Sequence, residues 1–499
     1  MAIGFVAADE EAEKIWLHSE PEANASARVR DVRWGDFLNL QGDTDDGWRR
    51  VKWGGETYFI RDEHVTSTRP LEIIFVDVGQ GDGCIVVSPE TGAQERILVV
   101  DAGQGDNMFR FVKWRFGKLQ QSFRFHAAVL THSDVDHYGG FKLLFEHENV
   151  SFDRVYHNGL AERPGDDLFG ASDGSGKFLV ELAATHADME HLFADAAGLG
   201  GKKYPTLMHA ALAGGRVEKI EMLSASHGAQ EGGKAWMPGY SPSAGRACTI
   251  EVLGPVPEKL ANGALALRWF AGHDEGKTKN GHSVLLRVTI GDLRLFLGGD
   301  LNRPAEEYLL RHYGEIDGNS ALSAAVATAA TRLGADIMKS CHHGSADVTD
   351  EFLQAVNPFA FVVSSGDEES HAHPRPDLLG RLGKHGRGEA PLILCTEIFR
   401  STREEGKSED FARLRALDRK IDSASTSDAD KTAARAERKA LQDHIQRRNV
   451  GVYGAITMRT DGQRLEITYR LEKPRGKQLW QSYVLKRQAG EWRVIETSH

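Results

Sequence analysis

The stretch FHAAVLTHSDVDHYGG, residues 125–140, begins as an apolar strand and ends in a loop crowded with ionisable side chains. Two histidines and two aspartates, His132, Asp134, Asp136 and His137, stand within six residues, and two glycines follow them. A solvated loop rarely concentrates imidazoles and carboxylates in this way, whereas metal sites often do. A loop that directly follows a buried strand is held by a rigid element, as a catalytic site requires. The stretch therefore predicts a metal site whose other ligands come from distant parts of the chain.

Apolar runs rich in β-branched residues and bounded by glycines occur on both sides of this stretch. Such runs predict further buried strands, and several of them also end in polar side chains. The runs are LEIIFVDVGQGDGCIVVS (71–88), ERILVVDAGQG (95–105), NGHSVLLRVTIGDLRLFLGGD (280–300), ADIMKSCHHGS (335–345) and PFAFVVSSGDEESHAHPRPDLLGRL (358–382).

The ends of these runs carry the side chains that could complete the site. Asp300 follows two glycines, and because glycine lets the backbone come close, this carboxylate is suited to bridge two metal ions. Two metals about 3.5–4 Å apart can hold a water molecule between them and lower its pKa. Nitrogen and oxygen donors without sulfur suit zinc or manganese. The other polar groups at these positions are His282, His342 and His343.

The composition narrows the class of protein. The chain of 499 residues has a formal net charge of −11 and is 40% hydrophobic, which argues against indiscriminate coating of nucleic acid and for a large core. The four cysteines are widely spaced and predict neither disulfides nor a thiolate zinc site. The N-terminus does not resemble a signal peptide, and no run approaches the roughly 18 apolar residues of a membrane span. We therefore expect a soluble, cytoplasmic protein without a membrane partner.

The pattern of residue types divides the chain into several predicted structural regions. Residues 1–26 read as a polar tail or a helix, and residues 27–69 as short strands (VRDV, FLNLQG, WRRVKW, TYFIRD) separated by Gly/Asp turns. The spacing of aromatic and glycine residues in the second part resembles a bacterial SH3-like barrel. Residues 401–448 read as two amphipathic helices around a turn. Alternating residues at 476–499 predict a C-terminal β extension.

The motifs around the predicted metal site resemble the metallo-β-lactamase superfamily, and in particular the metallohydrolase domain of ComEC-like DNA-uptake proteins. The matching pieces are FVDVGQGDGCIVV, VVDAG, LTHSDVDHYGG, NGHSVLLRV, FLGGDL, KSCHHGS, HPRPDLL and the hairpin GAITMRTDGQRLEITY. They cover roughly residues 71–156, 279–400 and 450–470. The resemblance implies an αββα sandwich over residues 70–475 with a two-metal cleft at one edge. It also implies that residues 157–278 and 401–448 are insertions, the first a lid or cap and the second a helical hairpin.

The resemblance also assigns roles to the polar residues. His132, Asp134 and either His282 or His342 would hold one metal, Asp136, His137 and the remaining histidine the other, and Asp300 would lie between them. Of His342 and His343, we expect His342 to be the ligand and His343 to support a ligand or contact the substrate. Near His282, the side chain of Asn280 could take the place of His282 as a ligand. The ions would be Zn²⁺ or Mn²⁺, with Mg²⁺ possible because Asp134 hardens the site. The expected catalytic residues are Asp136, His343 and His373, and the expected supports of the ligands are Asp82 and Asp101.

Three functions fit these predictions. The first is a metal-dependent phosphodiesterase, a nuclease acting on DNA or RNA, since the resemblance implies DNA as the substrate class. The second keeps the site but acts on a small phosphodiester, such as a cyclic nucleotide or a choline phosphate, or on another ester. The third is an interaction module that docks a protein partner through the SH3-like barrel or the helical hairpin, with hydrolysis latent until assembly, as in a defence effector.

Overall fold

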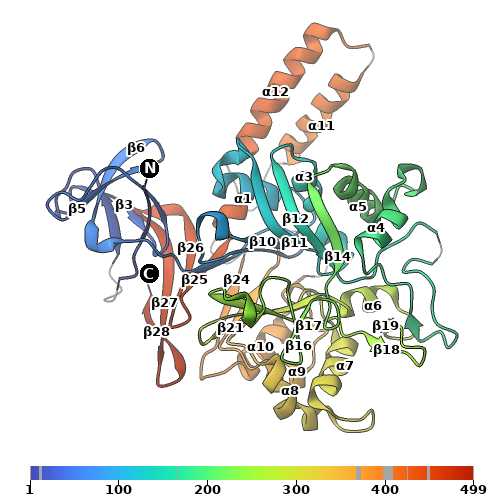
Figure 1. Cartoon of the computed structure of the whole chain (residues 1–499). Coiled ribbons are helices and arrows are strands. Elements are labelled where there is room, and N and C mark those ends of the chain that lie inside the picture. The colour runs from blue at the N-terminus through green and yellow to red at the C-terminus, as the bar shows by residue number, and fades with distance from the viewer. Residues whose placement is uncertain are drawn as a thin grey trace.

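Two large β-sheets form the centre of the molecule (Figure 1). The computed structural model describes residues 2–9, 14–165, 167–366, 372–396, 408–423, 425–446 and 450–497. In spatial order, the ten-stranded sheet contains β14 (Val217–Met222), β12 (Val150–His157), β11 (Phe123–Val129), β10 (Ile97–Ala102), β9 (Gly83–Val87), β8 (Leu71–Phe75), β25 (Ile456–Thr460), β26 (Arg464–Arg475), β27 (Gln478–Gln488) and β28 (Glu491–Thr497). The eight-stranded sheet contains β15 (Ala229–Glu231), β16 (Lys234–Trp236), β17 (Cys248–Gly254), β20 (Leu285–Ile290), β21 (Leu293–Leu297), β22 (Ile337–Lys339), β23 (Ala360–Val363) and β24 (Leu392–Cys395).

The alternation of side chains along the strands explains why the two sheets pack face to face. In β8, Ile73 and Phe75 join a core that also contains Leu286 and Leu295 of the other sheet. Ile74 lies on the opposite face of β8, in a second core. Because successive side chains of a strand point to opposite faces, continuous apolar runs such as LEIIF are suited to a sheet that is covered on both sides.

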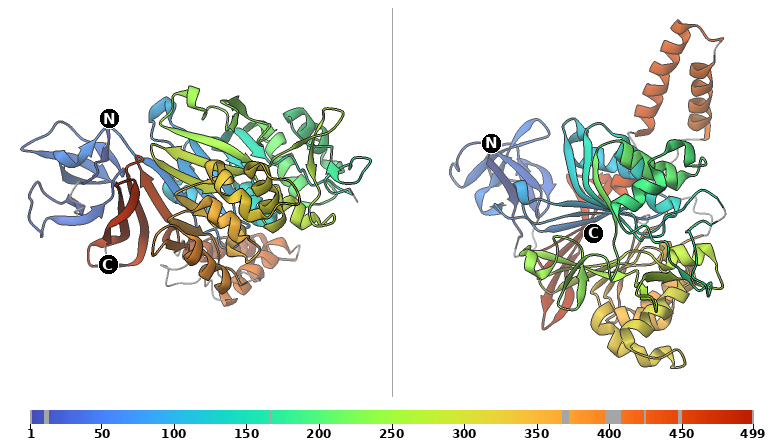
Figure 2. Two further views of the ribbon diagram at one scale, coloured as in Figure 1. Left: turned by 90° about the horizontal axis from the view of Figure 1, so that it is seen from below. Right: turned by 45° about the vertical axis from the view of Figure 1, so that its right-hand side comes forward.

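Helices cover the outer face of each sheet. The ten-stranded sheet is covered by α1 (Asn107–Arg115), α3 (Phe141–Glu146), α4 (His186–Phe193), α5 (Lys203–Ala213) and α13 (Val450–Tyr453). The eight-stranded sheet is covered by α7 (Arg303–Gly314), α8 (Val326–Leu333), α9 (Asp350–Val356) and α10 (Pro376–His385). The result is a mixed α/β body with the order helix, sheet, sheet, helix (Figures 1 and 2). Two shorter helices, α2 (Val135–Tyr138) and α6 (Glu275–Gly281), lie at the candidate site described below.

A separate all-β sheet precedes this body. Its seven strands follow the spatial order β3 (Arg28–Val32), β2 (Ile15–His18), β6 (Glu56–Arg61), β5 (Trp48–Trp53), β4 (Phe37–Leu40), β1 (Ala2–Val6) and β7 (Val65–Thr66). The expectation of a tail or helix at residues 1–26 is therefore wrong, because β1 and β2 are integral strands. The short apolar runs IGFV and IWLH bury residues such as Val6 and Leu17 in the core of this sheet. The acidic residues between the two runs obscured this pattern.

The two predicted insertions differ in how they join the body. Within 157–278, β14 and β17 are strands of the two main sheets and α4 and α5 cover one of them, so this region is not simply a lid or cap. Its separate part is a three-stranded sheet of β13 (Phe178–Leu179), β19 (Leu265–Arg268) and β18 (Glu258–Lys259). Residues 401–407 of the second region lie outside the described residues. The rest contains α11 (Ser408–Asp422) and α12 (Asp428–Gln446), which form a hairpin that projects from the body (Figure 1).

Among the residues that the structure describes, no helix combines the length and the apolar character needed to cross a lipid bilayer.

Candidate metal centre

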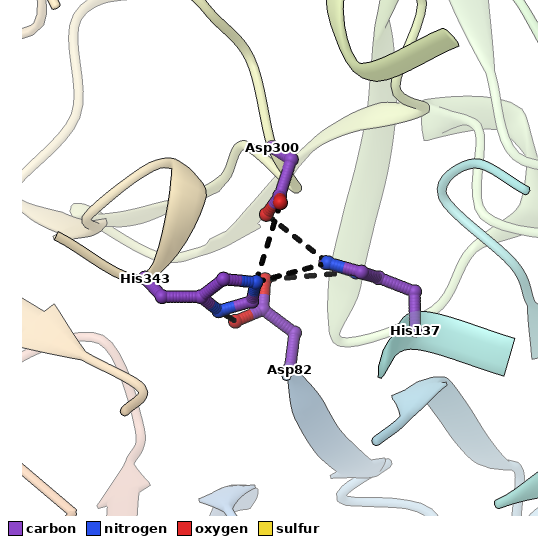
Figure 3. A group of neighbouring side chains, drawn as sticks. All are labelled: Asp82, His137, Asp300 and His343. Carbon is purple, nitrogen blue, oxygen red and sulfur yellow. Dashed lines mark hydrogen bonds and ion pairs between the residues drawn. The ribbon is translucent and has the colours of Figure 1, made fainter. Parts of the chain in front are cut away.

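Four buried side chains from distant parts of the chain converge on one another (Figure 3). They are Asp82, His137, Asp300 and His343, and one potential ligand atom of each lies within 4.8 Å of those of the others. Asp82 directly precedes β9, His137 belongs to α2 after β11, Asp300 follows β21 and His343 follows β22. These four residues could hold a metal ion, and we call them the metal centre. Each side chain thus lies next to a strand end or in a short helical turn that follows a strand, and these rigid elements hold it in place.

The imidazoles of the metal centre face each other across the Asp300 carboxylate. Nε2 of His137 lies 3.1 Å from Asp300 Oδ1, and Nε2 of His343 lies 3.2 Å from Asp300 Oδ2. The two Nε2 atoms are 3.2 Å apart. Donor atoms of three side chains therefore point at one small buried volume.

Carboxylates behind the two histidines fix the orientation of the rings. His137 Nδ1 lies 2.8 Å from Asp101 Oδ2, and the Thr131 hydroxyl donates to the same oxygen at 2.7 Å. His343 Nδ1 lies 3.1 Å from Asp82 Oδ1. Ligand histidines usually present their second ring nitrogen to a carboxylate, which fixes the tautomer and makes the coordinating nitrogen more basic. Asp82 and Asp101, for which the sequence predicts supporting roles, both occupy this kind of position.

Lys339 is a member of the site that the sequence analysis missed. Its ammonium group forms an ion pair with Asp82, donates to the carbonyl of Gly299 at 3.0 Å and lies 4.0 Å from Asp300 Oδ1. The side chain is buried at the end of β22. The only signal in the sequence is a lysine that ends an otherwise apolar strand, because a buried ammonium group requires an anionic partner.

A close approach of two backbones brings the GQGD motif to the predicted metal loop. Gly81 has φ of +109°, and a Cβ atom at this position would collide with the carbonyl oxygen of Asp136. Glycine is therefore required here for both its conformation and its lack of a side chain. This contact places Asp82 beside the loop that carries His137.

His132 and Asp134 form a second group next to the metal centre. The ring centroids of His132 and His137 are 4.1 Å apart, and His132 Nε2 lies 3.5 Å from Asp134 Oδ2. The other Asp134 oxygen accepts a charged hydrogen bond from Lys279 at 2.6 Å, and Lys279 in turn contacts Glu162 at 3.2 Å. Burial alone would raise the pKa of Asp134, but His132 and Lys279 lower this pKa to about 2. Asp134 is therefore an anion, and a lysine side chain neutralises it in the structure.

Three further predicted residues lie around the metal centre. Asp136 Oδ2 is 3.5 Å from His343 Nε2, and His342 Nε2 is 3.7 Å from Asp300 Oδ2. The His342 side chain is 30% exposed, and the His373 ring lies 5.8 Å from that of His342. His343, rather than the expected ligand His342, has the buried position opposite His137. Both residues have positive φ, 51° and 52°, so no strand alternation determines which ring faces inward.

The structure does not bring His282 to the metal centre, in contrast to the sequence prediction. Its Nε2 is 2.8 Å from the carbonyl oxygen of Arg268, and its ring packs 4.7 Å from that of Phe270. Burial lowers the pKa of His282 to about 4, so the ring is neutral. At the end of the same helix, the side-chain amide of Asn280 donates to Asp134 Oδ2 at 2.8 Å when its nitrogen faces that residue. Asn280, which the sequence analysis gave as the alternative, therefore reaches the site in place of His282.

The charges of the metal centre suit a divalent cation. Burial opposes protonation of His137 and His343, but nearby carboxylates, above all Asp300, hold the pKa of both histidines well above its usual value. Burial would raise the pKa of Asp300, and the two imidazoles instead hold it well below its usual value. His132 Nε2 and Asp300 Oδ1 are buried and lie 3.5 Å from Asp134 Oδ2 and 3.1 Å from His137 Nε2, but neither atom forms a hydrogen bond of good geometry with any described residue. A cation among these oxygen and nitrogen donors would replace the protons and satisfy both atoms.

The chain is similar to known competence proteins. ComE operon protein 3 of Bacillus subtilis (strain 168) is 22% identical over 333 residues, which cover 63% of this chain and 31% of that protein. Competence protein ComA of Neisseria gonorrhoeae is 34% identical over 108 residues, or 21% of this chain and 13% of that protein. The chain therefore spans less than a third of the length of either relative. No protein-family model matches it.

Proposed function

We propose that this protein is a metal-dependent phosphodiesterase that cleaves nucleic acid. The observation that carries the proposal is the convergence of His137 Nε2, His343 Nε2 and the Asp300 carboxylate in one buried cluster. The helix, sheet, sheet, helix order of layers supports a metallo-β-lactamase architecture for this body. The similarity to competence proteins and the motifs shared with DNA-uptake metallohydrolases support nucleic acid as the substrate class.

The donor set favours two Zn²⁺ or Mn²⁺ ions, because it contains nitrogen and oxygen atoms but no sulfur. When bound, such a pair supplies an activated water and neutralises charge on the substrate oxygens. The inner ion of the pair would be held by His137, His343, Asp136 and Asp300. The outer ion would be held by His132, Asp134 and His342. Lys279 occupies Oδ1 of Asp134 at 2.6 Å, so Oδ2, which lies 3.5 Å from His132 Nε2, is the oxygen that would face an ion.

The remaining residues of the site have proposed roles other than binding a metal ion. Asp101 and Asp82 hold the Nδ1 atoms of His137 and His343, so that both Nε2 atoms point at Asp300. Lys339 holds Asp82 in place through their ion pair. His373 lies on the more exposed side of the site beside His342, where it can donate a proton to the leaving alkoxide.

The substitution Asp300→Asn tests this proposal. It preserves shape but removes the charge that holds both histidines, so we expect loss of bound metal by elemental analysis and loss of Mn²⁺- or Zn²⁺-dependent cleavage of DNA and RNA. Asp292→Asn is the matched control, because Asp292 is an exposed aspartate at the turn of the same β20–β21 hairpin. A folded Asp300→Asn protein that cleaves nucleic acid normally would refute the proposal, as would wild-type protein that binds no divalent ion.

A small phosphodiester is the second candidate substrate. Lys279, just beyond the long 157–278 region, contacts Asp134, and Glu162 within this region contacts Lys279, so the region borders one side of the site. Enclosure on this side favours a small molecule over a polymer. Including a cyclic nucleotide and a choline phosphate ester in the same cleavage panel separates the two classes. Activity that appears only after a protein partner is added would instead support the hypothesis of a latent enzyme that docks through the N-terminal sheet or the α11–α12 hairpin.

A further inference from the structure

A wide groove lies between the N-terminal sheet and the helix-covered face of the ten-stranded sheet. Its volume is about 1090 Å³, and its walls come from the N-terminal sheet, from β8, β26 and β27, and from α1. Figure 2 shows the N-terminal sheet beside the C-terminal strands, on the side of the body away from α7 to α9. We call this space the aromatic groove. It contains none of the residues of the metal centre.

Tryptophan and arginine side chains alternate across the aromatic groove. Trp53 comes from the N-terminal sheet, Trp114 from α1 and Trp480 from β27. The Arg470 guanidinium lies 5.3 Å from the ring centre of Trp114 and 5.8 Å from that of Trp480, and Arg30 lies 5.7 Å from that of Trp53. Trp114 is 42% exposed, so part of its ring is free to contact a molecule that enters the groove.

The charges that remain unpaired in the groove are positive. Every carboxylate of the lining has an arginine partner, with Asp31 paired to Arg33, Asp36 and Glu72 to Arg459, and Glu95 to Arg69. By contrast, Arg30, Lys52 and Arg470 form no ion pair with any described residue. In a chain with a net charge of −11, three uncompensated cations in one groove mark a site for an anion.

We propose that the aromatic groove binds single-stranded nucleic acid. A polyanion neutralises the three cations, and only unpaired bases offer the ring faces that tryptophans can stack on. A duplex hides these faces between its base pairs, and an acidic peptide would leave the tryptophans without a stacking partner. The inference deepens the proposed function and rests on it for the choice of polymer, since the groove would hold a strand whose other part reaches the metal centre.

The position of the groove determines the expected kinetic effect. β8 begins at the wall of the groove, and the loop after it carries Asp82. Five residues of an extended strand span roughly 16 Å, so the groove acts at a distance from the chemistry. Substitutions in the groove should therefore raise KM for a long strand and leave kcat unchanged, and they should not affect a dinucleotide substrate.

Fluorescence anisotropy with a labelled oligothymidylate in EDTA measures binding without cleavage. Trp114→Ala should weaken binding roughly 5- to 150-fold, the usual cost of losing one base-stacking ring. Arg30→Gln and Arg470→Gln should each lower the slope of log K against log salt by about 0.7. The matched controls are Trp16→Ala and Arg28→Gln, which remove a similar pair, 5.6 Å apart, in the N-terminal sheet outside the groove. Thermal unfolding checks that each variant is folded.

The outcomes separate this inference from the proposed function. Tight binding that the groove variants weaken supports the inference even if the Asp300→Asn test shows no metal-dependent cleavage. The inference is overturned if wild-type protein does not bind the oligonucleotide at low salt, or if the groove variants bind as well as the controls. Equal affinity for a duplex, or full displacement of the strand by an equal concentration of polyglutamate, would also overturn it.

Discussion

Two buried charge clusters lie at opposite ends of β8, and they are built from different kinds of cation. The metal centre contains two histidines facing the carboxylates of Asp82 and Asp300. The second cluster, which we call the arginine network, consists of Asp36, Glu72, Arg115 and Arg459. There Glu72 lies 2.7 Å from both arginines, and Arg459 also lies 2.7 Å from Asp36 of the N-terminal sheet.

The difference teaches how to distinguish a structural charge cluster from a functional one. Arginine does not lose its proton in proteins, so the arginine network is complete as it stands. Its guanidinium groups lower the pKa of Glu72 to about 2 in spite of burial. The histidines of the metal centre can exchange their protons for a cation, and buried atoms such as Asp300 Oδ1 form no hydrogen bond of good geometry with any described residue. Permanent pairing fixes a fold, whereas exchangeable pairing provides a binding site.

Removing one arginine from the network should have the largest effect on stability. Arg459→Leu leaves Asp36 buried without its cation and leaves Glu72 with only the partly exposed Arg115, and it separates the N-terminal sheet from β25. Loss of one partner of a buried pair costs about 3–5 kcal/mol, so urea unfolding should show a destabilisation of this size. Arg487→Leu is the matched control, since its pair with Asp292 is partly exposed and should contribute no more than about 1 kcal/mol. Equal losses in both variants would show that the network does not hold the two parts together.

Acid should weaken the arginine network in a defined pH range. The pKa of Glu72 is about 2 in the folded protein against 4.5 for a free glutamate, so its charge stabilises the fold above pH 4.5. This contribution, about 3 kcal/mol from a shift of this size, is lost as the pH falls from about 4.5 towards 2. Urea unfolding of wild type and Glu72→Gln across this range measures it. The gap in stability between the two proteins should close as the pH falls, and a constant gap would contradict the assignment.

Loss of a carboxylate that supports the metal centre should change the free energy of unfolding less than loss of Arg459 does. Asp101→Asn keeps the size of the side chain and tolerates the positive φ of 55° at this position. It removes the anion behind His137, and such changes usually cost about 10- to 100-fold in metal affinity. Titration with Zn²⁺ or Mn²⁺ against a competing chelator measures the change. The free energy of unfolding of the metal-free protein should change less than it does in Arg459→Leu, and the opposite order would contradict the comparison.

The sequence predicted the strands well because they combine apolar runs with glycine boundaries. The loops of His132–His137 and Asp300 were also predicted, since their polar residues directly follow such runs. Lys339 was missed because its partner, Asp82, lies far away in the chain and no local pattern connects them. The choice between His342 and His343 could not be made, because it depends on two consecutive left-handed residues.

His282 shows the limit of reasoning from position alone. It begins the apolar run before Asp300 in the sequence, as a ligand might, yet α6 ends there and turns the ring towards Arg268 and Phe270. A histidine near a strand end is a ligand only if the preceding helix leaves its ring free. Asn280, in the last turn of α6, instead faces the site and contacts Asp134.

The smallest effect is therefore expected for His282→Gln. The glutamine amide can still donate to the Arg268 carbonyl, so the free energy of unfolding should fall by no more than about 1 kcal/mol, the net value of one hydrogen bond. Metal content and affinity should match those of wild type, because no atom of the metal centre contacts this ring. His343→Gln is the matched comparison and should lose the metal, since its Nε2 lies 3.2 Å from Asp300. Elemental analysis of both variants decides the point: metal loss in His282→Gln would return His282 to the ligand set and require α6 to rearrange when the cation binds.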